Sequence, residues 1–91
     1  MKNSDKIEFH EYCVRCTDKQ VLGVLEKEAR ARRIGYRDIA LREARKRDLA
    51  VSDVIRALID GDIEYPDASA LVGVEWGLDQ DEVGNLYDMG M

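Results

Sequence analysis

The side chains best suited to chemistry stand close together near the start of the chain. His10, Cys13 and Cys16 follow the pattern H-x2-C-x2-C, and an imidazole with two thiolates supplies three of the four ligands of a tetrahedral zinc site. A fourth ligand would be a carboxylate, a water or a residue of a second chain, because the sequence has no second Cys-x2-Cys pair. A redox pair and two structural or free cysteines are the alternatives. We expect the structural or free pair, since a redox Cys-x2-Cys normally belongs to a strand–helix unit that is not predicted here.

No other group of residues predicts catalysis. The chain has a single histidine, His10, which lies outside the predicted helical domain, and Ser52 and Ser69 are both expected at the starts of helices. The glycines are scattered and form no phosphate-binding loop. We therefore expect a protein that is not an enzyme and that needs no cofactor.

Length and composition predict one small folded domain. The chain has 91 residues, of which 45% are hydrophobic and 36% are charged, a composition typical of a folded, strongly charged domain rather than a disordered tail. No apolar run approaches the length of a membrane span, and no signal-peptide pattern opens the chain. We expect a cytoplasmic protein that does not enter the membrane.

Charge is distributed very unevenly along the chain. The net charge of −5 combines +5 over residues 1–47 with −10 over residues 48–91, and most of the basic residues lie in the block 30–47. Such a block binds phosphates or an acidic protein in some proteins. It is equally consistent with a solvated helix face, or with a face that pairs with the acidic half of the same chain.

Hydrophobic periodicity and capping signals predict an all-α bundle of about five short helices joined by short loops. Thr17 and Gln20 form a T-x-x-Q capping box that opens the first helix, and Asp79 and Glu82 form a D-x-x-E box that opens the last. Ser52 is the expected N-cap of the middle helix, and Gly61 its end. The first expected helix runs from 17 to about 33 and is ended by Ile34 and Gly35. The others run from 36 to 47, 52 to 60, 66 to 76 and 79 to 87.

The residues before Thr17 are predicted to form a short extended N-terminal arm, residues 1–16, attached to a helical domain of residues 17–88. Ile7 to Val14 alternates in polarity like a short strand. A strand has no partner in so helical a chain, so the arm is expected to pack on the helices or to pair with a second copy.

Residues 49–86 read LAVSDVIRALIDGDIEYPDASALVGVEWGLDQDEVGNL, and this order of features resembles the phage-repressor-like (XRE-type) helix-turn-helix family. That family shows a small residue at the turn, a short amphipathic helix and a glycine. A loop with a proline follows, then a helix ending in Leu/Trp-Gly-Leu, then Asp-x-Asp-Glu-Val. The matching positions here are Ala50, Ile55, Gly61, Pro66, Leu71, Gly77, Leu78, Asp79 and Glu82.

The resemblance covers roughly residues 20–87 and implies a lambda-repressor-like fold with a helix that reads DNA. The chain would be a small DNA-binding transcriptional regulator from a phage or mobile element, acting as a homodimer on double-stranded DNA. Ser52, Asp53 and Arg56 would face base edges from the recognition helix. The phosphate contacts would come from the preceding helix, through Arg37, Arg42 and Arg45.

Departures from the family pattern support a second hypothesis. The helix that the resemblance assigns to DNA recognition carries Asp53 and Asp60, and carboxylates are unfavourable in a groove lined with phosphates. The same scaffold could instead be an acidic protein-binding module, for example a phage-encoded inhibitor or adaptor that mimics DNA and binds a basic host protein. Trp76, Leu86 and Tyr87 could form an exposed patch for such a partner, although we expect these side chains to fill the core.

Overall fold

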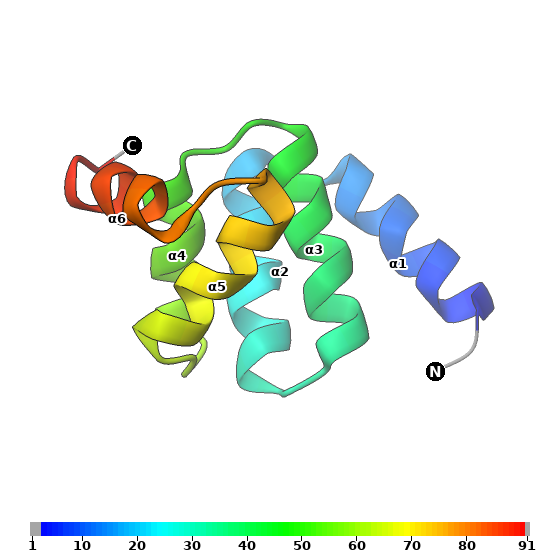
Figure 1. Cartoon of the computed structure of the whole chain (residues 1–91). Coiled ribbons are helices and arrows are strands. Elements are labelled where there is room, and N and C mark those ends of the chain that lie inside the picture. The colour runs from blue at the N-terminus through cyan, green and yellow to red at the C-terminus, as the bar shows by residue number, and fades with distance from the viewer. Residues whose placement is uncertain (1–2, 91) are drawn as a thin grey trace.

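The computed structural model describes residues 3–90, which fold into six α-helices and no strand. The expectation of an all-α fold is confirmed, with one helix more than expected. The central helices α2 to α5 form a bundle, and α1 and α6 lie at its two ends (Figure 1). The helices are α1 (Asn3–Arg15), α2 (Asp18–Arg30), α3 (Ile34–Lys46), α4 (Val51–Asp60), α5 (Tyr65–Trp76) and α6 (Gln80–Asp88).

The prediction of an extended N-terminal arm is wrong, because residues 3–15 form helix α1. Phe9 and Cys13 stand four residues apart and therefore share one face of the helix. The Phe9 ring meets the Tyr36 ring of α3 edge to face, with centroids 4.6 Å apart, and Cys13 is fully buried. Packing of these two side chains against α3 stabilises a helix in this segment. Because α3 lies outside the segment, the alternating polarity of Ile7 to Val14 could not predict this packing.

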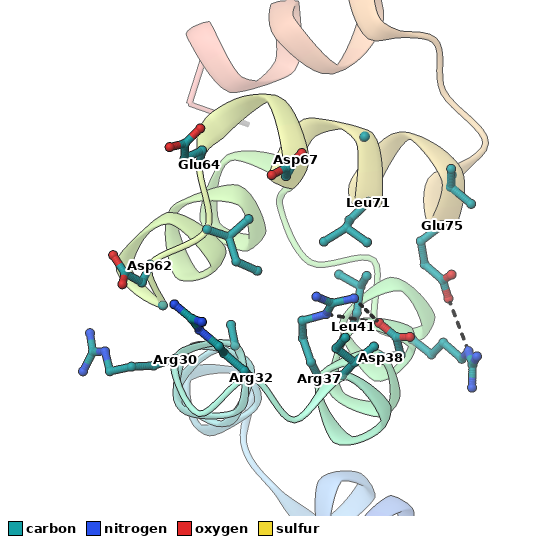
Figure 2. A pocket seen from close by; sticks show the side chains of 17 residues that line it. Arg30, Arg32, Arg37, Asp38, Leu41, Asp62, Glu64, Asp67, Leu71 and Glu75 are labelled. Atoms are coloured by element: carbon teal, nitrogen blue, oxygen red, sulfur yellow. Dashed lines mark hydrogen bonds and ion pairs between the residues drawn. The ribbon is translucent and has the colours of Figure 1, made fainter.

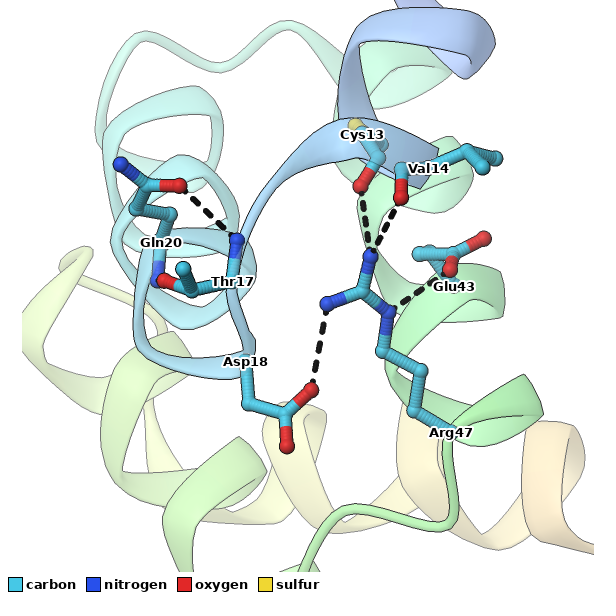
Figure 3. A network of polar contacts seen from close by, with 7 residues as sticks. All are labelled: Cys13, Val14, Thr17, Asp18, Gln20, Glu43 and Arg47. Atoms are coloured by element: carbon cyan, nitrogen blue, oxygen red, sulfur yellow. Dashed lines mark hydrogen bonds and ion pairs between the residues drawn. The ribbon is translucent and has the colours of Figure 1, made fainter.

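Arg47, just after α3, holds the C-terminal end of α1 in place (Figure 3). Its guanidinium donates to the backbone carbonyls of Cys13 and Val14, both at 2.9 Å. The same group donates to the carboxylate of Glu43 at 2.8 Å and to that of Asp18 at 3.1 Å. A cation at the C-terminus of a helix binds carbonyls that have no partner within the helix. One side chain therefore joins α1, α2 and α3.

Helix α2 begins as the sequence predicts and ends earlier. Both hydrogen bonds of the capping box between Thr17 and Gln20 are present. The helix ends at Arg30, and Arg32 adopts a left-handed conformation with φ 59° that turns the chain. Ile34 and Gly35, predicted to end this helix, instead begin α3.

Helix α4 ends at Gly61 as predicted, but its predicted N-cap is wrong. Its N-cap is Ala50, whose side chain has no oxygen to accept a hydrogen bond, and Ser52 lies inside the helix. Gly61 has φ −82°, and the left-handed residue is Asp62 with φ 74°. A glycine is needed at position 61 because there is no room for a side chain. An added Cβ would lie 2.7 Å from the Ala29 Cβ and from the backbone oxygen of Glu26.

The last two helices begin and end close to where the sequence predicts. Pro66 lies in the first turn of α5, where its missing N–H has no cost, and Gly77 ends the helix with φ 68°. The Asp79 carboxylate caps α6 by accepting from the Glu82 N–H at 2.8 Å.

Helix α4 is the centre of the hydrophobic core. It packs against α2, α5 and α6, whereas α3 packs against α1, α2 and α5 and makes little contact with α4. Core residues on three helices are fully buried, among them Val21, Leu25, Ala40, Ala44, Val54, Ile55 and Leu58. The bundle therefore buries the helix that the family resemblance presents as the DNA reader.

Candidate functional site

The two cysteines of the predicted metal or redox motif are buried, and the histidine is not. Cys13 is fully buried and Cys16 is 8% exposed, while His10 points to solvent from α1. Both thiols are free. Within residues 3–90, no group of three or more His, Cys, Asp or Glu side chains is arranged to hold a metal ion.

The environment of Cys13 makes it a poor nucleophile. Burial raises the pKa of its thiol from 9.0 to about 11, and neighbouring groups of negative charge, Cys16 and the Glu43 carboxylate, add to the rise. The nearby Arg47 cation opposes that rise without cancelling it. Reactive cysteines need a lowered pKa and access to solvent, so Cys13 has the properties of a packing residue.

The predicted DNA-reading residues of α4 have little free surface around them. Asp53, Arg56 and Asp60 are exposed and Ser52 is half-buried, whereas Val51, Val54, Ile55, Ala57 and Leu58 are buried. The exposed strip of the helix therefore carries one cation between two carboxylates. Its charge is net negative, which is unfavourable beside DNA phosphates.

The three predicted phosphate-binding arginines of α3 are engaged within the chain. Arg37 donates to its neighbour Asp38 from two nitrogens, at 3.2 and 3.0 Å, and only 16% of its side chain is exposed. The carboxylate of Glu75 on α5 lies 4.0 Å from Arg42 Nε, and the Glu75 carbonyl accepts from Arg45 Nε at 2.8 Å. The C-terminal ends of α3 and α5 are thereby joined.

A concave surface with a volume of about 960 Å³ lies between α3 and α5. We call it the α3–α5 groove; the end of α2 and the loop 61–64 close one side of it (Figure 2). None of its lining residues comes from α4. The lining residues of the two helices are Ile34, Arg37, Asp38, Leu41 and Arg42 on α3, and Asp67, Ala70, Leu71, Val74 and Glu75 on α5.

The floor of the α3–α5 groove is apolar. Leu41 and Leu71 approach each other from opposite helices (Figure 2), and Ile63 also lines the groove. Two further apolar side chains extend this surface toward solvent, since Val74 is 84% exposed and Ile34 is 59% exposed. A contiguous apolar surface of this kind, bordered by polar residues, is typical of a protein interaction site.

The two sides of the α3–α5 groove carry opposite charges (Figure 2). Arg30, Arg32 and Arg42 line the side formed by α2 and α3. The opposite side is acidic; its residues are Asp62, Glu64, Asp67 and Glu75. Among the described residues, Asp62, Glu64 and Asp67 take part in no ion pair, although Glu75 is near Arg42. Three carboxylates on this side therefore remain available to a ligand.

The sequence predicts Arg37 and Arg42 as binding residues, but it does not predict the apolar floor of the α3–α5 groove. A signal was present in α5, whose apolar residues fall on opposite faces: Ala68 and Val72 are buried, whereas Leu71 and Val74 line the groove. A helix that is apolar all round normally has all its faces covered. In α5, Val74 instead lies on an uncovered face, with 84% of the residue exposed.

The aromatic residues considered as a patch pack partly into the core. Trp76, Leu86 and Tyr87 are half-buried against buried core residues, and the Tyr87 ring lies 5.1 Å from the Tyr65 ring. Their packing fits the expectation that they fill the ends of the core.

Searches against protein-family models, curated proteins and solved structures found no match to this chain. Within residues 3–90, none of the helices has the length and apolar character needed to cross a membrane.

Proposed function

We propose that this chain is a protein-binding module whose docking site is the α3–α5 groove. One observation carries the proposal: an apolar floor, with Val74 84% exposed, lies between a basic side and an acidic side. An amphipathic helix with an apolar stripe and opposite charges on its two flanks fits such a surface. A protein partner of that chemistry is a better match than a nucleic acid, whose phosphates would meet the carboxylates.

The same conclusion follows from the helix proposed to read DNA. In a helix-turn-helix, the second helix must present a row of side chains to the major groove. In α4 that row is reduced to Asp53, Arg56 and Asp60, because the rest of the helix forms the core. An acidic protein-binding module, the second of the sequence hypotheses, agrees better with these positions.

Photo-crosslinking from the groove floor tests the proposal. A benzophenone side chain introduced at Val74 should crosslink the full-length protein to a protein partner in its native cells. The same probe at Lys19, an exposed residue outside the groove, should give no crosslink. Glu64→Lys should reduce the Val74 crosslink at least several-fold, and Asp81→Lys, which changes an exposed carboxylate outside the groove, should not. Equal labelling from Val74 and Lys19, or none from Val74, would contradict the proposal.

DNA binding is the second candidate function, and the basic surface of α3 favours it. Arg42, Arg45 and Lys46 are all exposed on the C-terminal half of this helix. Basic side chains on one helix face form an electrostatic footprint for phosphates. A homodimer would be required, because one short helix contacts too few base pairs for useful specificity.

A salt series with duplex DNA distinguishes the two candidate functions. If α3 grips phosphates, log K should fall linearly with log salt, and Arg42→Ala with Arg45→Ala should reduce the slope by about 2. Arg56→Ala should then cost about 1–3 kcal/mol of specific binding. Absence of binding at low salt, measured by fluorescence anisotropy, would reject the DNA-binding function.

A further inference from the structure

We infer that the occupant of the α3–α5 groove is helix α1 of a second copy of this chain. The inference rests on the proposed function, because it names the partner for the same groove. Its evidence is a second unpartnered apolar surface in the molecule, on the outer face of α1, whose length and charges match those of the groove.

The outer face of α1 carries an apolar stripe that nothing in the chain covers. Ile7 is 60% exposed and Val14 is 49% exposed. Val14 lies seven positions after Ile7, about two helical turns, so the two side chains lie almost in line along the helix. Phe9 and Cys13 lie on the side of α1 that packs against α3. The stripe therefore faces away from the bundle.

The stripe has the length of the α3–α5 groove. Ile7 and Val14 are about 10 Å apart along the axis, at about 1.5 Å per residue. The lining residues of α5 run from Asp67 to Glu75, which is about 12 Å by the same measure. The stripe is therefore about as long as the stretch of α5 that lines the groove.

The two flanks of the stripe differ in charge, as the two sides of the groove do. At 3.6 residues per turn, Glu8 and Glu11 fall on one flank, with Arg15 at its C-terminal end, and Lys6 falls on the other flank with His10. All five side chains are exposed. In one of the two orientations of the helix, the glutamates meet the basic side of the groove, and Lys6 meets its acidic side.

A chain cannot fill its own groove in this way. Tyr36 lies on the face of α3 that contacts α1, whereas Ile34 and Leu41 lie on another face, which lines the groove. The outer stripe of α1 points away from both. Docking therefore joins two different surfaces of two copies, a heterologous contact that closes into a ring or continues as an open chain.

Complementation between two variants tests this contact in the full-length protein. Val14→Lys places a charge in the stripe, and Val74→Lys places one on the groove floor; both side chains are exposed, so folding should survive, as circular dichroism will verify. In sedimentation velocity, the wild-type mass should rise with concentration, and each variant alone should remain a monomer. An equimolar mixture of the two should give a complex of twice the monomer mass, because each variant retains one intact surface.

Matched controls are Tyr12→Lys, on α1 but off the stripe, and Met89→Lys, outside the groove; both side chains are exposed. Both should associate like the wild type. A wild-type chain that stays monomeric at every concentration would overturn the inference, as would association that neither Val14→Lys nor Val74→Lys reduces. If the chain is monomeric while the Val74 photoprobe captures a different protein, self-docking fails and the proposed function stands. If the chain is monomeric and the photoprobe captures no protein, both the self-docking inference and the proposed function are wrong.

Discussion

At the scale of single residues, Arg47 and Cys13 show how position in the fold determines what a side chain does. Arg47 belongs to the basic block predicted to bind phosphates, yet its guanidinium binds the carbonyls of Cys13 and Val14 and two carboxylates. Cys13 belongs to a motif that suggests a metal site, yet it is fully buried. Arginine often binds phosphate and cysteine often binds a metal, but in this fold the Arg47 guanidinium binds groups of its own chain and Cys13 is packed in the core.

The Cys13 thiol is expected to be unreactive in the native protein. Its pKa is raised from 9.0 to about 11, so at pH 8 its thiolate fraction is about 100-fold smaller than that of an unperturbed thiol. In a Cys16→Ser background, a disulfide reagent should label Cys13 no faster than α1 opens, and at once in denaturant. Rapid labelling of the native protein would show that Cys13 is accessible and ionised.

The same shift predicts how stability depends on pH. Because the folded-state pKa of Cys13 is raised, its contribution to stability is complete below pH 9.0 and is lost as pH rises toward about 11. In that window the unfolded chain loses the proton and the folded chain retains it. Cys13→Ala should flatten this part of the curve in urea unfolding experiments. An unchanged slope would mean that another group causes the alkaline decline.

At the scale of elements, two glycines in helical segments differ in what a methyl group would meet. Gly23, inside α2, has no atom within 4 Å of an added Cβ, whereas Gly61, at the end of α4, has the Ala29 Cβ and a backbone oxygen at 2.7 Å. Close approach of α4 to α2 thus depends on Gly61. The exposed position of Gly23 has no such requirement.

Alanine substitutions at these two glycines should change stability in opposite directions. Gly61→Ala should destabilise the protein by about 1–3 kcal/mol, the usual cost of overpacking, because α4 must shift away from α2. Gly23→Ala should stabilise it by about 0.5–1 kcal/mol, since alanine loses less backbone entropy in a helix. Equilibrium urea unfolding measures both. A neutral Gly61→Ala would show that the two helices approach less closely.

At the scale of the whole molecule, the bundle combines a well-buried centre with a lightly attached end. α4 packs against α2, α5 and α6, whereas α1 packs chiefly against α3. The basic and acidic halves of the chain also meet, since Arg42 lies near the Glu75 carboxylate and Arg45 donates to the Glu75 carbonyl. Part of the charge asymmetry is therefore satisfied internally, as one of the sequence interpretations allowed.

Helix α1 should open independently of the bundle. Regions with few buried contacts exchange their amide hydrogens through local unfolding, so amides of α1 should exchange at least about tenfold faster than those of α4. Arg47→Met should accelerate exchange in α1 more than in α4, because the guanidinium binds the last carbonyls of α1. Hydrogen-exchange mass spectrometry at low protein concentration provides the measurement. Equal protection of α1 and α4 would indicate a single cooperative unit.

The sequence by itself determined the features that depend on neighbours along the chain. The Thr17 and Asp79 caps, the end of α5 at Gly77 and the buried stripes of α2 and α4 all follow from contacts within a few residues. Periodicity reports these contacts directly. The helical fold class was therefore predictable, and so were most of the core residues.

Only the tertiary structure decided which surfaces remain open. The α3–α5 groove depends on Leu41 and Leu71, thirty residues apart, lying on facing helices. The helical form of α1 depends on Phe9 meeting Tyr36. Packing of α4 against three other helices likewise decides that its exposed residues are Asp53, Arg56 and Asp60, a strip of net negative charge. Such outcomes depend on how helices pack across the molecule, and local sequence patterns carry no information about that packing.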